Sequence, residues 1–209
     1  RVKIEANAFF YSSSHLNIDS LPFRRSSSQK TLVIGFAGRM NRMLLPTYLW
    51  LGKLDHSKYD FLFVWDGLSN YYKSGVGGFA SSPSLLVTRI NGLIEDFGYS
   101  KEKVVGVGAS MGAYPCAAIV RQLGCKSALL LSPGCLSDYP EYVDLLKNAK
   151  SECMLYLCCG KDNPSDVIRM RKFSANFSPT HSRFVKGCSG HNVLWYLSKK
   201  GAFADFISS

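Results

Sequence analysis

The sequence lacks a hydrophobic run long enough to cross a membrane. Its longest stretch without a charged residue, residues 104–120, contains a proline and three glycines. A spanning helix needs roughly 20 predominantly apolar residues, so we expect no membrane span. The chain also lacks an internal repeat. Hydrophobic residues make up 46% of it and charged residues 19%, which excludes a disordered, collagen-like or coiled-coil protein.

Acidic residues are scarce relative to basic ones. There are 15 Asp and Glu against 25 Lys and Arg, a net charge of +10. The basic residues are scattered along the chain, and neither a long basic run nor zinc-finger spacing accompanies them. We therefore expect no nucleic-acid partner. An ordinary solvated surface explains this charge, and an anionic polysaccharide is the alternative partner that it would suit.

No C-x-x-C pair occurs among the seven cysteines. A structural zinc site is therefore not expected, and no motif calls for another metal or a cofactor. The cysteine count is odd, and several cysteines lie in strongly apolar segments. This pattern favours buried reduced thiols and hence a reducing compartment, so we expect a cytoplasmic location.

Short apolar runs alternate with longer amphipathic segments along the chain. The expected strands are residues 31–36, 59–65, 103–107, 127–131, 153–159 and a short one at 183–185, and the expected helices are 83–97, 112–123, 141–148, 166–177 and 192–207. Nearly continuous apolar runs are typical of strands buried on both faces. Strand and helix in alternation predict an α/β fold, a three-layer sandwich with a mostly parallel central sheet and helices on both faces.

The length of the chain fits one such domain. We expect a single domain over residues 1–209, in which residues 1–30 form a peripheral N-terminal strand and loop. Residues 70–84 are rich in glycine, serine and tyrosine but lack the Gly-Lys-Ser/Thr ending of a phosphate-binding P-loop. We therefore interpret them as a flexible loop beside the site.

Residues 108–112 (GASMG) carry the most specific motif. G-x-S-x-G between a buried strand and a helix is the pattern of a nucleophile elbow, with Ser110 as the nucleophile. Small residues two before and two after the serine let strand and helix approach closely, so the hydroxyl projects at the carboxyl edge of the sheet. Pro115 lies early in the expected helix and predicts an irregular first turn.

A serine nucleophile needs a base, and the base needs an acid that orients it. Among the four histidines, His191 lies in a loop between the last expected strand and the final helix. This loop opens at the same sheet edge as Ser110, and Gly187 and Gly190 give its backbone freedom to turn the ring inward. We therefore predict His191 as the base.

The orienting acid should come from another loop at that edge. Asp162 comes just after the expected strand at residues 153–159 and is the predicted acid. Asp138, which follows the preceding strand, is one alternative. Asp166 is the other, although we expect it to cap the next helix, as aspartate often does.

The chain order Ser110, Asp162, His191 resembles that of the α/β-hydrolase superfamily, and the likeness runs from residue 31 to the final helix. In that superfamily a His-Gly-x loop after the first main strand completes the oxyanion hole. Residues 34–38 (IGFAG) occupy its place here, with isoleucine instead of histidine. The resemblance implies Met111 N–H as the first oxyanion donor and Phe36 N–H as the second; a small register shift would make the second Ala37, Gly38 or Arg39.

Residues 159–162 (CGKD) and 190–191 (GH) are also similar to motifs of bacterial polysaccharide O-acetyltransferases of this fold. The first hypothesis is thus a serine esterase that forms an acyl-enzyme with a small-molecule or carbohydrate ester. The second is an O-acyltransferase that passes the acyl group to a polysaccharide hydroxyl, and the third is a non-catalytic binding domain with a hydrolase-like fold. The connector at residues 132–140 is too short for a helical lid, so we expect an open site.

Overall fold

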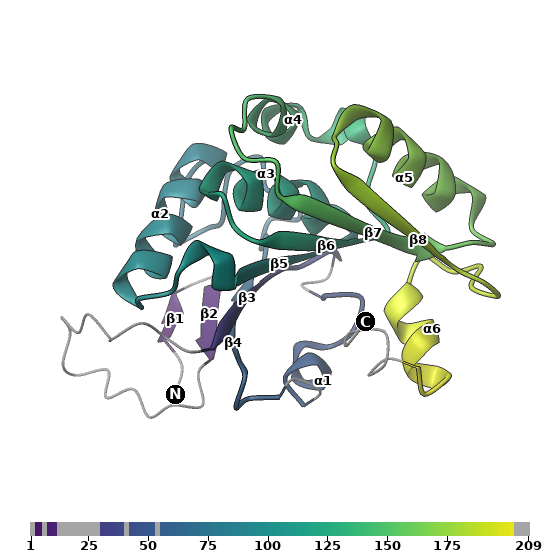
Figure 1. Ribbon diagram of the computed structural model, residues 1–209, viewed down its shortest axis with the longest axis horizontal. Coiled ribbons are helices and arrows are strands. Elements are labelled where there is room, and N and C mark those ends of the chain that lie inside the picture. The colour runs from purple at the N-terminus through teal and green to yellow at the C-terminus, as the bar shows by residue number, and fades with distance from the viewer. Residues whose placement is uncertain (1–2, 6–7, 12–29, 40–41, 53–54, 203–209) are drawn as a thin grey trace.

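The computed structural model describes residues 3–5, 8–11, 30–39, 42–52 and 55–202. It shows a twisted sheet between two layers of helices (Figure 1), which confirms the predicted α/β sandwich. The serine-rich segment at residues 12–29 lies outside the described residues. Within the described part of the chain, no helix combines the length and the apolar character that a membrane span requires.

The sheet has eight strands in the order β1-β2-β4-β3-β5-β6-β7-β8. Six of them are parallel: β3 (Thr31–Phe36), β4 (Tyr59–Val64), β5 (Val104–Ala109), β6 (Ser127–Leu131), β7 (Met154–Gly160) and β8 (Thr180–Val185). The expected N-terminal edge strand is instead a pair, β1 (Lys3–Glu5) and β2 (Ala8–Tyr11), and β2 runs antiparallel to β4.

Two helical layers cover the sheet (Figure 1). One contains α2 (Pro83–Asp96), α3 (Ala113–Leu123), α4 (Pro140–Lys147) and α5 (Pro164–Asn176), and the other contains α1 (Thr47–Leu51) and α6 (Val193–Lys199). Short 3₁₀ turns also occur, among them η2 (Lys101–Lys103), η3 (Ser110–Gly112) and η4 (Leu136–Asp138). Helix α1 was not expected, because five residues are too few to show a helical hydrophobic period.

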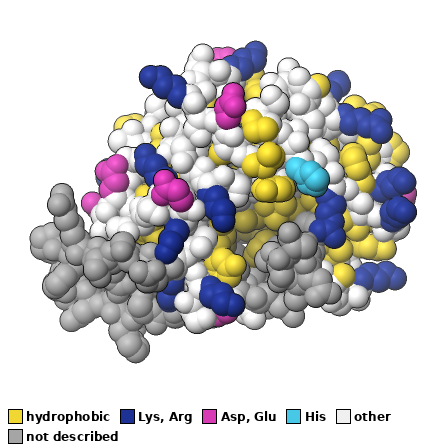
Figure 2. Space-filling model, in the orientation of Figure 1, with side chains coloured by type: hydrophobic (Ala, Val, Ile, Leu, Met, Phe, Trp, Pro, Cys, Tyr) yellow, Lys and Arg dark blue, Asp and Glu magenta, His cyan; other side chains and the backbone are white. Residues whose placement is uncertain are grey.

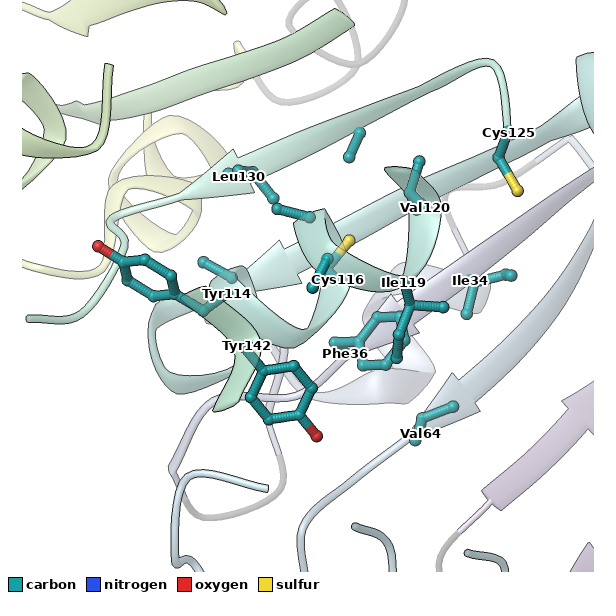
Figure 3. Packing of buried hydrophobic residues seen from close by; sticks show 14 of the residues in the cluster. Ile34, Phe36, Val64, Tyr114, Cys116, Ile119, Val120, Cys125, Leu130 and Tyr142 are labelled. Atoms are coloured by element: carbon teal, nitrogen blue, oxygen red, sulfur yellow. The ribbon is translucent and has the colours of Figure 1, made fainter. Parts of the chain in front are cut away.

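Alternate residues of each central strand enter two separate hydrophobic cores, because strand side chains point to opposite faces of a sheet. Leu32, Ile34 and Phe36 of β3 pack toward the layer of α2–α5, whereas Val33 packs toward α1 and α6. Figure 3 shows Ile34 and Phe36 beside Ile119 of the central helix α3. Nearly every residue of α3 is buried, so the helix that follows Ser110 is fixed along its length.

The segment at residues 70–84 is packed, in contrast to the expected flexible loop. Tyr72 and Val76 are fully buried, and a bridge joins Val76 to Ala80. The carboxylate of Asp66 accepts hydrogen bonds from the amides of Leu68 and Tyr72 and so fixes the start of the segment. Tyr72 and Phe79 of this segment supply core contacts.

The cysteines and basic residues match their expected placement. All seven cysteines are free thiols, and only Cys135 is exposed. Figure 2 shows Lys and Arg side chains spread over the visible face, with hydrophobic patches between them, and not gathered into one stripe.

Candidate active site

Ser110 lies in the sharp turn between β5 and α3. It begins the 3₁₀ turn η3, and its φ of +51° falls in the left-handed region that non-glycine residues rarely adopt. Such a conformation costs about 1–3 kcal/mol and persists only where its surroundings enforce it. The turn directs the serine hydroxyl to the carboxyl edge of the sheet.

The two glycines of the motif permit this turn by close backbone approach. A Cβ on Gly108 would lie 2.6 Å from the carbonyl oxygen of Gly112, and one on Gly112 would lie 2.2 Å from that of Phe36. Larger residues would push α3 away from β5 and β3. Pro115 is the third residue of α3, where a missing N–H removes no bond within the helix, so the expected irregularity is confined to the 3₁₀ turn.

His191 contacts Ser110 directly. Its Nε2 lies 2.8 Å from the serine Oγ. The loop that carries it follows β8 and is anchored by its own backbone, because the carbonyl of His191 accepts a hydrogen bond of 2.9 Å from the Ser132 hydroxyl. Gly187 has a φ of +75°, as a sharp turn requires, whereas Gly190 does not use this freedom.

The acid that contacts His191 is Asp166. Its Oδ2 and Oδ1 lie 2.8 and 3.0 Å from Nδ1 of the imidazole, and the carboxylate is almost fully buried. The side chain of Asn163 also donates to Oδ2 over 3.2 Å, and Nη1 of Arg169 lies 3.4 Å from Oδ1. Nδ1–H of the ring therefore donates to a carboxylate that other donors hold in place.

Asp162, the acid predicted from the sequence, is not the carboxylate that contacts His191. Asp162 instead accepts a hydrogen bond of 2.7 Å from the amide of Gly187, and Asp138 ends the 3₁₀ turn η4. Asp166 is not the cap that the sequence pattern predicts, because α5 begins two residues earlier than expected. Asn163 caps the helix, and its side chain accepts a hydrogen bond from the Asp166 amide. Asp166 thus occupies the first turn of α5, with its carboxylate free to face His191.

Most of the backbone amides that were expected as the second oxyanion donor already donate hydrogen bonds to other carbonyls. The amide of Ala37 donates to the carbonyl of Val64 over 3.0 Å. Successive N–H groups of a parallel strand point alternately to its two neighbouring strands. Since the amide of Ala37 points to β4, that of Phe36 points to β5, with which β3 also pairs. The amide of Gly38 donates to the carbonyl of Arg42 over 2.8 Å. Of the four candidates for the second oxyanion donor, the amide of Arg39 is therefore the one that these bonds leave available. Met111 is the second residue of η3, where an N–H has no acceptor within the turn.

No sequence motif indicated that Tyr72 belongs to the site. Its buried hydroxyl donates to the carbonyl of Ala37 over 2.8 Å and lies 3.2 Å from that of Val64. Burial raises the pKa of this phenol far above its ordinary value, and the nearby carboxylate of Asp66 raises it further. Tyr72 therefore stays protonated and fixes the loop that passes Ser110. Only the packing of residues 70–84 reveals this contact.

The described residues include no group of three His, Cys, Asp or Glu side chains arranged to hold a metal ion. What the site brings together is a hydroxyl, an imidazole and a buried carboxylate in a hydrogen-bonded row. Such a row can move a proton from the hydroxyl to the imidazole while the carboxylate stabilises the imidazolium.

Comparison with solved structures finds extensive similarity at low sequence identity. A capsule O-acetyltransferase of Neisseria meningitidis serogroup A aligns with a TM-score of 0.68 and 13% identity over 100% of this chain and 94% of that chain. The fluorophosphonate-binding serine hydrolase FphF of Staphylococcus aureus gives 0.59 and 15% over 96% and 91%. Est1E from Butyrivibrio proteoclasticus gives 0.56 and 10% over 99% and 96%.

No protein-family model matches the chain, and no curated protein matches it in sequence. The fold therefore rests on the structure. The chain has a parallel sheet with flanking helices, and its structural neighbours are esterases, serine hydrolases and an acetyltransferase. The architecture and the neighbours indicate the same fold. The chain has the α/β-hydrolase fold.

Proposed function

We propose that the protein is a serine hydrolase that cleaves acyl esters. The observation that carries this proposal is the continuous row of hydrogen bonds from Ser110 through His191 to Asp166. Nucleophile, base and acid follow one another in the row at distances of 2.8 Å, which suits the transfer of a proton along it. Chance rarely assembles such a row at a strained serine between a strand and a helix.

In the proposed reaction Oγ of Ser110 bonds to the carbonyl carbon of the ester while Nε2 of His191 takes the hydroxyl proton. The Met111 amide donates to the oxyanion. As the tetrahedral intermediate collapses, the ester C–O bond breaks and His191 gives its proton to the leaving alcohol. A water molecule then attacks the acyl-enzyme, again losing a proton to His191, and the acid leaves.

Water access supports hydrolysis as the fate of the acyl-enzyme. The side chain of His191 is 39% exposed, so solvent reaches the base from outside. The connection from β6 to α4 contains only η4 and short turns, and it adds no helical lid over Ser110. An open site favours short or accessible acyl groups over long-chain fats.

A fluorophosphonate probe tests the proposal. We expect it to label the protein at Ser110 and to block hydrolysis of 4-nitrophenyl acetate, whereas Ser110→Ala should fold normally and neither react nor turn over. Ser100→Ala serves as the control, because Ser100 is an exposed serine before η2, and this variant should still be labelled. Full labelling of Ser110→Ala would refute the assignment. Absence of both labelling and turnover in the wild type would favour a non-catalytic binding domain.

Transfer to a sugar hydroxyl is the second candidate. It is supported by the similarity of residues 159–162 and 190–191 to polysaccharide O-acetyltransferase motifs, and by the structural likeness to a capsule O-acetyltransferase. The same acyl-enzyme would serve both reactions. Acetate release from an aryl acetate, measured with and without candidate glycans, separates them: a glycan that suppresses acetate release while becoming acetylated indicates transfer.

A further inference from the structure

Gly38 packs against the turn that carries the nucleophile. A Cβ on Gly38 would lie 3.2 Å from Cβ of Ser110 and 2.9 Å from the carbonyl oxygen of Ala109. The next residue, Arg39, is exposed. Arg39 therefore directly follows a residue that packs against Ser110, and its side chain extends into solvent at the rim of the site.

A tyrosine cluster holds the guanidinium of Arg39 at this rim. Nη2 donates to the hydroxyl of Tyr71 over 3.2 Å. The ring of Tyr71 lies edge-on against Tyr139, with centroids 5.4 Å apart, and Tyr139 stacks on Tyr114 of α3 at 4.5 Å. Tyr114 is four residues after Ser110, so the cluster connects Arg39 to the helix that follows the nucleophile.

The positive charge of Arg39 is available to a ligand. Among the residues that the structure describes, no carboxylate lies within ion-pair distance of its guanidinium. Both Asp138 and Arg39 influence the phenol of Tyr139. Burial raises the pKa of Tyr139, the charge of Asp138 raises it further, and the charge of Arg39 lowers it. A guanidinium carries five N–H donors, and the single bond to Tyr71 leaves most of them unused.

A second guanidinium lies on the other side of the nucleophile. Arg169 on α5 contacts Oδ1 of Asp166, and 40% of its side chain remains exposed. In the sheet, β3 lies on one side of β5 while β6 and β7 lie on the other, so Arg39 and Arg169 approach Ser110 from opposite flanks. The charge of Arg169 is offset by Asp166, so the uncompensated positive charge of this pair is that of Arg39, and it attracts an anion and repels a cation.

We propose that Arg39 binds an anionic group, a carboxylate or a phosphate, carried by the ester substrate. This inference rests on the proposed function and names the charge of the substrate that the site selects. The forked guanidinium can bind either anion through two parallel N–H···O bonds. Arg39 would thus act by binding and orienting the substrate, while the proton transfers remain with His191.

Pairs of esters that differ only in charge test the proposal. On the acyl side the pair is 4-nitrophenyl hydrogen adipate and 4-nitrophenyl methyl adipate, and on the alcohol side 3-carboxyphenyl acetate and its methyl ester. At low ionic strength, we expect Arg39→Gln to lower kcat/KM for the anionic member of at least one pair about tenfold, mainly through KM. Its effect on the neutral members should stay within about twofold, and Arg39→Lys should restore part of the loss.

Arg171→Gln is the matched control, because Arg171 is an exposed arginine on α5 that contacts none of the site residues named above. It should leave all four esters unaffected. Equal losses for charged and neutral esters in Arg39→Gln, or an equal loss in Arg171→Gln, would overturn the role of Arg39. In that case labelling of Ser110 and turnover of neutral esters would leave the proposed hydrolase standing. Failure of every ester and of labelling would remove both.

Discussion

The carboxylate of Asp162 accepts a hydrogen bond from the amide of Gly187, with Oδ2 and N 2.7 Å apart. This bond joins the loop after β7 to the loop that presents His191. A second bond, from the Asp162 amide to the carbonyl of Cys188, doubles the connection. Asp162 therefore positions the loop that carries His191, the proposed base, and the carboxylate of Asp166 faces the imidazole itself.

This division predicts different outcomes for two substitutions. Asp166→Asn should lower kcat by about 10⁴-fold, because the amide neither fixes the tautomer of His191 nor stabilises the imidazolium. Asp162→Asn should lower kcat by about tenfold or less, because the backbone bond to Cys188 remains and the reacting groups keep their contacts. Steady-state hydrolysis of a neutral aryl ester measures both.

Both substitutions are isosteric, which makes them matched controls for each other. Thermal unfolding should show that each variant is folded under assay conditions. If Asp162→Asn lost as much activity as Asp166→Asn while remaining folded, Asp162 would participate more directly than its contacts indicate.

Tyr72 provides a second prediction, since its hydroxyl holds the carbonyl of Ala37. Tyr72→Phe leaves this buried acceptor without its closest donor, which should reduce the free energy of unfolding by about 1–3 kcal/mol. The loop beside Ser110 is then less well placed, so we expect kcat to fall by roughly tenfold with little change in KM. Urea unfolding and steady-state kinetics measure the two effects.

Tyr142→Phe separates stability from positioning. The Tyr142 hydroxyl donates to the carbonyl of Tyr72 over 2.9 Å, whereas that of Tyr72 donates to Ala37 beside Ser110. Tyr142→Phe should lower the free energy of unfolding by about as much as Tyr72→Phe, but it should change kcat by no more than about twofold. An equal fall of kcat in both variants would show that Tyr72 acts only through overall stability.

Much of the fold could be predicted because local pattern determines it. The central strands are short apolar runs bounded by polar residues, and β3 (Thr31–Phe36) and β6 (Ser127–Leu131) match the predicted boundaries. Ser110 and His191 were identifiable because a motif and a loop position specify them. The pairing of β1 with β2 could not be expected, since an apolar segment at an edge does not show where the chain reverses.

The position of Asp166 and the hydrogen bonds of residues 36–39 depend on shifts of one or two residues that sequence patterns do not resolve. Helix α5 starts at Pro164 because Asn163 caps it, and this changes the place of Asp166 from cap to first turn. Likewise, the amide of Ala37 still pairs with β4, one residue beyond the last residue of β3. Long-range contacts such as that of Tyr72 with Ala37 leave no periodic signal in the sequence.

A third prediction concerns the close approach at Gly112. A methyl group there would lie 2.2 Å from the carbonyl oxygen of Phe36, which is backbone and cannot move aside easily. Gly112→Ala should therefore lower the free energy of unfolding by about 3 kcal/mol or more and abolish turnover. Gly92 in α2 is the control, because a Cβ there meets nothing within 4 Å. Gly92→Ala should stabilise the protein by roughly 0.5–1 kcal/mol; destabilisation by both would contradict the steric argument.

The last prediction concerns the reactivity of the cysteines, because six of them are buried and Cys135 is exposed. Burial raises the pKa of Cys125 and Cys158 to about 12 and that of Cys159 to about 11. Cys135 is exposed, and hydrogen bonds from the Ser137 hydroxyl and backbone lower its pKa. Since the thiolate is the reactive form, Cys135 should be the thiol that reacts in the folded protein.

We therefore expect iodoacetamide at pH 8 to add one group to the native protein, at Cys135, and seven in urea. A lowered pKa means that the thiolate forms at lower pH, so the alkylation rate of Cys135 should reach half its maximum below the pH found for unfolded protein. Ser137→Ala removes the hydroxyl hydrogen bond and should move that midpoint upward, whereas Ser174→Ala, at a half-buried serine on α5, should leave it unchanged. Mass spectrometry of tryptic peptides follows each site. Rapid modification of a second cysteine in the native state, or an unchanged midpoint in Ser137→Ala, would contradict this description of the thiols.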